Sequence, residues 1–224
     1  MFQDTLRRAA SIGLLIVVSA VVPAAQAKKT ARPPAVPAIR TEPADVACPA
    51  ILGYGVRTKR QFCDVITGSN AAAGIMIRIP PHQGTATLTF DLHNRHTYSE
   101  LQVKAGRAFA RYVASTGVFL PEKNTLVTRA VIDSEFRTEK DLFDRVGGGA
   151  GPGGLKAVAP TGVESISVAL PAGTENVSII GERLITISAD GTRTFSTPGL
   201  PIALVSNVAV EYRPLPLKKP AKKK

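Results

Sequence analysis

The alternation of apolar and polar side chains between residues 84 and 93 constrains the fold of this chain more than any other feature. Its apolar members share one side of an extended chain and are Ala86, Leu88, Phe90 and Leu92. The intervening positions hold only Thr, Asp and His. Successive side chains of a β-strand point to opposite faces of its sheet, so the pattern predicts a strand with one buried and one polar face. Such strands are typical of antiparallel sheets.

Other segments repeat this pattern or are bounded by Gly, Pro and Asp-Gly turn signals. We expect strands at 74–80, 84–93, 107–120, 126–137, 156–159, 165–170, 176–180, 184–188, 192–196 and 202–212. Two side chains that commonly cap helices, Ser99 and Thr138, predict short helices at 100–104 and 139–145. Many strands with little helix indicate an all-β fold, an antiparallel β-sandwich, of which the jelly roll is one form.

The first 27 residues have the organisation of a secretory signal peptide. Arg7 and Arg8 precede an apolar run from Ile12 to Val22, and small residues precede an expected cleavage site after Ala27. The run is shorter than the ~20 apolar residues that a membrane-spanning helix needs, so we expect no transmembrane segment in the mature chain. These features predict a secreted or periplasmic protein.

Positive charge is concentrated at the ends of the chain. The whole sequence has a net charge of +11, whereas residues 46–217 hold 17 Lys and Arg against 14 Asp and Glu, a net of +3. We expect a Pro-rich linker at 28–45, a single β-sandwich domain at 46–214 and a disordered Lys-rich tail at 215–224. Because runs of like charge are often interaction tails, the tail predicts binding to an anionic cell-envelope polymer or a membrane surface. Nucleic acid is not an expected partner, since the tail has no interleaved aromatic residues.

The chain has two cysteines, Cys48 and Cys63. An even pair in an exported chain predicts a disulfide. The alternative is a redox or metal-binding pair, but the spacing matches no redox motif and two residues supply only two ligands.

The polar end of the alternating strand is the first candidate site. Asp91, His93 and His96 offer a carboxylate and two imidazoles, which are donor types of metal sites and of acid–base catalysts. Asp91 and His93 share a strand face, whereas His96 joins them only if the strand bends at Asn94 and Arg95. In the alternative interpretation these side chains, Arg95 among them, satisfy local backbone groups at a strand end.

A charged strand face is the second candidate. It holds residues of alternating sign, which are Arg129, Asp133, Glu135 and Arg137. The pattern suits a ladder of ion pairs on an exposed sheet, and the alternative is a site for a sugar or a carboxylate. Sugar binding is weakened by the absence of Trp and an aromatic content of 5%.

These features lead us to expect a secreted, non-catalytic binding or structural protein of the cell envelope that has no cofactor. The alternative is a secreted hydrolase or metal-dependent enzyme centred on Asp91, His93 and His96. The G-x-S-x-G motif of many serine hydrolases does not occur in the sequence.

Overall fold

The structure is a computed structural model that describes residues 36–147, 150–151, 154–155 and 157–216. The expected signal peptide and the lysines of the expected tail lie outside these residues, so both stay predictions. Within the described part, no helix combines the length and the apolar composition needed to cross a membrane.

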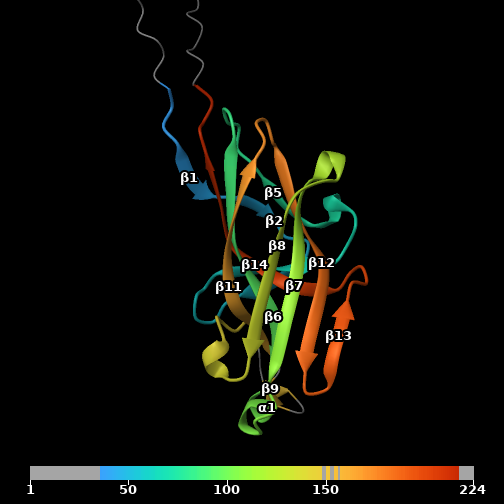
Figure 1. Cartoon of the computed structure of the whole chain (residues 1–224). Coiled ribbons are helices and arrows are strands. Elements are labelled where there is room, and N and C mark those ends of the chain that lie inside the picture. Colours follow the sequence, from blue (N-terminus) through green and yellow to red (C-terminus); the bar gives the residue numbers. More distant parts are fainter. Residues whose placement is uncertain (1–35, 148–149, 152–153, 156, 217–224) are drawn as a thin grey trace, which may run out of the picture. The chain divides into compact units, whose positions relative to one another are not determined.

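Two antiparallel sheets pack together and form the β-sandwich that the alternation predicts (Figure 1). Sheet A contains β1 (Arg40–Pro43), β3 (Ile51–Tyr54), β4 (Gln61–Ile66), β6 (Ala86–Tyr98), β11 (Ala157–Leu170) and β14 (Pro201–Tyr212). Sheet B contains β2 (Asp45–Ala47), β5 (Ile75–Arg78), β7 (Ala110–Leu120), β8 (Thr125–Phe136), β12 (Asn176–Ser188) and β13 (Gly191–Phe195). The orders are β11-β6-β14-β4-β3 with β1 on β14, and β2-β5-β12-β7-β8 with β13 on β12. This order does not confirm the jelly-roll form.

The main core lies between the two sheets. The apolar face of β6 is buried there, with Leu88, Phe90 and Leu92 at most 2% exposed. These side chains belong to one cluster with Ile132 of β8 and Ile179 of β12. Burying each such side chain stabilises the fold by about 1.5–3 kcal/mol, so the predicted alternation accounts for the central strand of the sandwich.

Two Gly-containing segments that we expected to separate short strands lie inside long ones. β11 continues through Gly162, where its register with β6 shifts between Thr161 and Glu164. β12 likewise continues past Gly181, with a register shift before Arg183. A β-bulge adds a residue to one strand without ending it, so these signals mark bulges rather than turns.

Helical structure is short, as expected. α1 (Glu100–Lys104) is capped by Ser99. Three single 3-10 turns are η1 (Ala71–Ala73), η2 (Pro121–Lys123) and η3 (Glu139–Asp141). Two strands of two residues each, β9 (Ala150–Gly151) and β10 (Gly154–Leu155), pair with each other.

The prediction of a helix at 139–145 is wrong beyond residue 141, because only the 3-10 turn η3 forms there. Residues 142–146, which we call the bridging segment, are bonded to the edge of β11 instead. Phe143 N donates to Pro160 O at 2.8 Å, and Val146 N donates to Val158 O at 2.9 Å. The free edge of β11 thus supplies acceptors that replace those of a helix.

The folded part begins earlier than composition suggests. Residues 40–43 form β1, which pairs with β14, and residues 45–47 form β2, which pairs with β5. Proline is compatible with a strand at its end, where Pro43 lies. The predicted disulfide is confirmed: Cys48 and Cys63 are bonded, with 5.8 Å between their Cα atoms. It joins the chain just after β2 in sheet B to β4 in sheet A.

Candidate functional site

The polar face of β6 is covered by other parts of the chain. Val146 of the bridging segment pairs with Val158 of β11 on one side and with Gly55, in the turn between β3 and β4, on the other. A second small core that includes Phe62, Val146 and Leu204 forms beneath this closure. His93 is consequently 0% exposed although it lies on the face opposite the main core.

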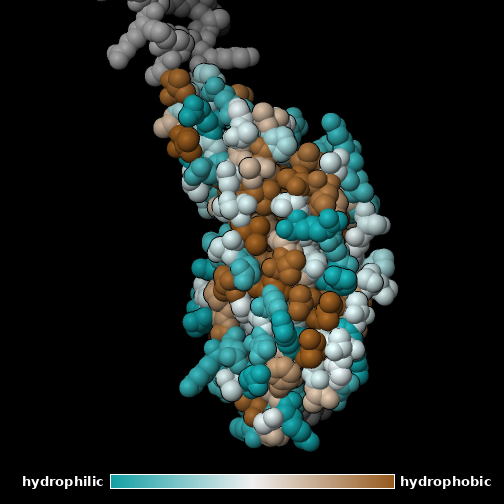
Figure 2. Space-filling view, viewed as in Figure 1, coloured by the Kyte–Doolittle hydropathy of each residue, from teal (hydrophilic) through white to brown (hydrophobic). Residues whose placement is uncertain are grey.

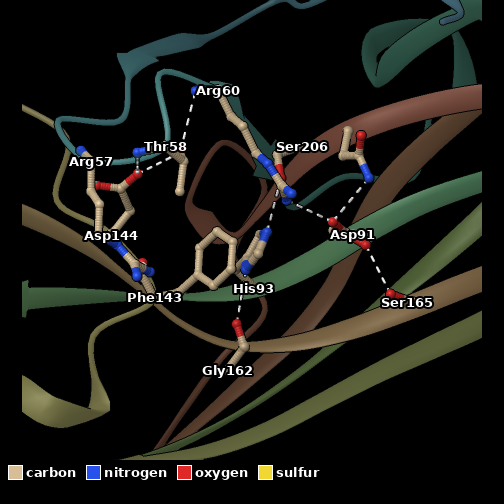
Figure 3. Close-up of polar contacts among 11 residues, drawn as sticks. Arg57, Thr58, Arg60, Asp91, His93, Phe143, Asp144, Gly162, Ser165 and Ser206 are labelled. Atoms are coloured by element: carbon tan, nitrogen blue, oxygen red, sulfur yellow. Dashed lines mark hydrogen bonds and ion pairs between the residues drawn. The ribbon is translucent and has the colours of Figure 1, made fainter.

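Both ring nitrogens of His93 have partners (Figure 3). Nδ1 lies 2.8 Å from Gly162 O, and Nε2 lies 3.0 Å from Ser206 Oγ. Because a carbonyl can only accept, Nδ1 carries the proton and Nε2 accepts the hydroxyl hydrogen of Ser206. Burial lowers the pKa of His93, although the bond to Gly162 and the charge of Asp91 oppose this. The imidazole is therefore neutral at neutral pH, with one defined tautomer.

Asp91 holds the neighbouring arginine in place. Its carboxylate accepts from Arg60 Nη1 at 2.9 Å, Ser165 Oγ at 2.9 Å and Asn207 Nδ2 at 3.2 Å. The guanidinium of Arg60 also lies 5.4 Å from the centre of the Phe143 ring. We call Arg60, Asp91, His93, Ser165, Ser206 and Asn207 the His93 cluster.

Phe143 forms the lid of this cluster. Its ring centre lies 4.6 Å from that of His93. The adjacent Asp144 fixes the turn above it by accepting from the backbone N–H groups of Arg57, Thr58 and Arg145 at 2.9, 2.8 and 2.7 Å. Burial opposes the ionisation of Asp144, but these bonds and that of the Thr58 hydroxyl outweigh it and lower the pKa of the carboxyl.

Arg95 lies on the same face of β6 as Asp91 and His93, but its side chain forms an ion pair outside the His93 cluster. Its Nε donates to Asp64 Oδ1 of β4 at 2.7 Å. Burial raises the pKa of Asp64, and the charge of Arg95 reverses only part of this effect. Arg95 is thus committed to an ion pair within sheet A.

His96 lies on the opposite face of β6, towards sheet B. Asn94 Nδ2 donates to Ser134 Oγ at 2.7 Å, Ser134 Oγ lies 3.1 Å from Thr161 Oγ1, and Thr161 Oγ1 lies 2.7 Å from His96 Nδ1. The ring of His96 also packs edge-on against Tyr112. His96 Nε2 and Asn94 Oδ1 are buried and have no hydrogen-bond partner among the described residues.

The structure therefore does not bring together the three predicted ligands. β6 is paired on both sides through residues 91–94, and the bend that His96 would need does not occur. Asp91 and His93 share a face, and His96 is on the other. No group of three or more His, Cys, Asp and Glu among the described residues is arranged to hold a metal ion.

The second candidate is an exposed ladder of ion pairs on the outer face of sheet B. The pairs are Arg111–Asp133 at 2.5 Å, Arg129–Glu182 at 2.9 Å and Arg137–Glu135 at 3.1 Å. Exposed pairs of this kind typically contribute about 0–1 kcal/mol each. Figure 2 shows apolar side chains forming a discontinuous band among polar ones, and Val131, between the paired residues, is 52% exposed. This arrangement agrees with the ion-pair interpretation and leaves no free charge at the four predicted residues.

A groove of about 470 Å³ opens beside the His93 cluster. It lies along β14, between β1 and β4, and its lining includes Glu42, Val46, Arg60, Ser206, Asn207 and Val208. Sequence reasoning missed Ser206 and Asn207. The sequence feature that could have revealed them is a pair of polar residues inside an otherwise apolar run. In the structure this pair lies where the register of β14 with β6 shifts, and Asn207 has a φ of 54°.

Acid should destabilise the fold through His96. Burial lowers the pKa of its imidazole from 6.5 to about 4, and the charge of Asp141 opposes this. The unfolded chain therefore binds a proton between these pH values that the folded chain does not, so this contribution to stability is complete above pH 6.5 and is lost as the pH falls towards 4. We expect a loss of about 3 kcal/mol, measured by urea unfolding at a series of pH values. In His96→Gln, unfolding between pH 4 and 6.5 should take up one proton fewer, so the free energy of unfolding should fall less steeply with acid. An unchanged slope would contradict the assignment to His96.

Comparison with protein-family models, with curated proteins and with solved structures finds no match for this chain. Function is therefore inferred from its own fold and side chains. Chemically, the His93 cluster offers a neutral imidazole that accepts from a serine hydroxyl, beside an arginine that faces a groove.

Proposed function

We propose that this chain is an exported protein of the cell envelope, held on an anionic polymer or membrane surface by its basic terminal segments. The observation that best supports this is the pairing of β1 with β14, in which Arg40 lies opposite Tyr212. Figure 1 shows β1 and the end of β14 side by side at one end of the sandwich. Both basic segments therefore leave the domain at one place.

The number of residues between the basic residues of each terminal segment and the β1–β14 pair limits how far those residues can lie from it. Arg32 precedes Arg40 by eight residues, and Lys218 follows Tyr212 by six. An extended chain spans at most about 3.5 Å per residue, so Arg32 and Lys218 can lie at most about 30 Å from this strand pair, and the outermost lysines, 12 residues away, at most about 40 Å. Two linked binding segments reinforce each other, because the second one to bind acts at a high effective concentration.

The described domain itself contributes little net attraction. Its charges nearly balance, and several of its exposed arginines are paired with carboxylates. By contrast, a lysine near an anionic membrane surface contributes about 1 kcal/mol of attraction. Attachment of this kind requires no catalytic group.

Neutralising the tail should weaken attachment at low salt by at least tenfold. The variant replaces five lysines by glutamine, at Lys218, Lys219, Lys222, Lys223 and Lys224. Binding of the chain from Lys28 onward is measured by co-sedimentation with phosphatidylglycerol vesicles and with polygalacturonate across a salt series. Attraction to the surface should fall as salt rises, because salt screens exposed charges.

A matched control removes the same charge from exposed positions elsewhere, and its residues are Lys59, Lys104, Lys123, Lys140 and Arg193. This control should bind nearly as well as the wild type. Equal losses in both variants would show that only net charge matters, and no loss in the tail variant would remove the tail from the proposal.

A further inference from the structure

Ser206 and His93 have the geometry of a nucleophile and its general base. The 3.0 Å between Ser206 Oγ and His93 Nε2 lies within the 2.6–3.2 Å or so that proton transfer requires. The bond from Nδ1–H to Gly162 O orients the ring, so the lone pair of Nε2 is directed at the hydroxyl. Ser206, His93 and the carbonyl of Gly162 thus correspond to the nucleophile, the base and the orienting acceptor of a catalytic triad, in which the acceptor is usually a carboxylate.

The groove gives this pair an approach for substrate. Ser206 is 2% exposed overall and forms part of the groove wall, with Val46 and Val208 beside it. The volume of about 470 Å³ suits a small ligand, and the two valines suit a short acyl chain. The side chain of Arg60, 39% exposed and paired with Asp91, lines the same groove, and a positive charge near the reacting carbonyl stabilises an oxyanion.

The surrounding charges favour the transfer of a proton to His93. The carboxylates of Asp91 and Asp144 stabilise an imidazolium at this position, whereas Arg60 opposes it. Burial lowers the pKa of His93, so the ring is neutral at neutral pH and free to accept a proton. The lone pair required of a general base is therefore available, and the two carboxylates offset part of the cost that burial imposes on the protonated form.

We propose that Ser206 and His93 hydrolyse short acyl esters that enter the groove beside β14. Ser206 Oγ forms a bond to the acyl carbon while its proton passes to His93 Nε2. The ester C–O bond breaks, and the leaving alcohol takes that proton. Water then attacks the acyl-Ser206 carbon, gives a proton to His93, and releases the carboxylic acid as Oγ recovers its proton. This activity goes beyond surface attachment and involves different residues, so either proposal can fail alone.

Labelling of the wild-type chain with a fluorophosphonate, which reacts with activated serines, tests the proposal directly. We expect one adduct, mapped to Ser206 by peptide mass spectrometry, and hydrolysis of p-nitrophenyl acetate by the same protein. Absence of an adduct at Ser206 in the folded wild-type chain would overturn the proposal, and this measurement depends on no variant.

Variants then separate the roles of the two residues. Ser206→Ala should abolish labelling and reduce ester hydrolysis at least 100-fold, and His93→Gln should slow both by a similar factor. The matched control is Ser178→Ala, which removes another buried serine hydroxyl, one on β12 that donates to Ala71 O of η1. Hydrolysis lost equally in Ser178→Ala, or retained in Ser206→Ala, would also contradict the proposal.

Discussion

Asp91→Ala is expected to lower the free energy of unfolding by about 1.5–3 kcal/mol, because it removes a largely buried carboxylate that accepts a hydrogen bond from a charged group. The carboxylate accepts from Arg60, Ser165 and Asn207, and its side chain is 12% exposed. Without it, the charge of Arg60 and two polar donors lose their acceptor, and water, which reaches Arg60, Ser165 and Asn207, replaces it only in part. Urea unfolding at pH 7 measures the change.

Asp133→Ala is the matched control for this prediction. It removes the same group from an arginine pair that is close to 40% exposed on both sides. Water replaces the lost contact there, so we expect a change of less than about 1 kcal/mol. Similar losses in the two variants would show that burial does not set the importance of Asp91.

Removal of the disulfide in a Cys48→Ala, Cys63→Ala variant should lower the free energy of unfolding by about 3 kcal/mol. The bond closes a loop with a sequence separation of 15, and its main effect is to restrict the unfolded chain. It also ties the chain after β2 to β4, so its loss should loosen the N-terminal strands first. Urea unfolding measures the first effect, and amide hydrogen exchange at residues 40–47 measures the second.

Reductant supplies the control for the disulfide. Wild-type protein in dithiothreitol should unfold at nearly the same urea concentration as the double variant, and reductant should not change the double variant itself. A double variant as stable as the oxidised wild type would show that this loop is already restricted without the bond.

Local sequence signals determined most of the secondary structure and the side on which each residue of β6 lies. Alternation predicted the buried face of that strand, and capping residues predicted α1. Local signals failed at Gly162 and Gly181, because glycine serves a bulge as well as a turn, and only the pairing of the strand with its neighbours distinguishes the two. The helix expected past residue 141 failed because the edge of β11 competes for its backbone donors.

The candidate site required the tertiary structure. Alternation placed Asp91 and His93 on one face and separated His96 from them, but it predicted a polar face in contact with water. Burial of that face comes from the bridging segment, and the partners of His93 come from Ser206 and Gly162, 113 and 69 residues away in the chain.

The sequence by itself thus determined most strands from residue 75 onward but not β1 to β4, and it determined the disulfide pair, the excess of charge at the chain ends and the residue types available for chemistry. The tertiary structure alone decided which of these residues meet, that β1 pairs with β14, and that a serine faces His93. The physical reason is range: periodicity and capping act over a few residues, whereas strand pairing and burial join segments that are distant in the chain.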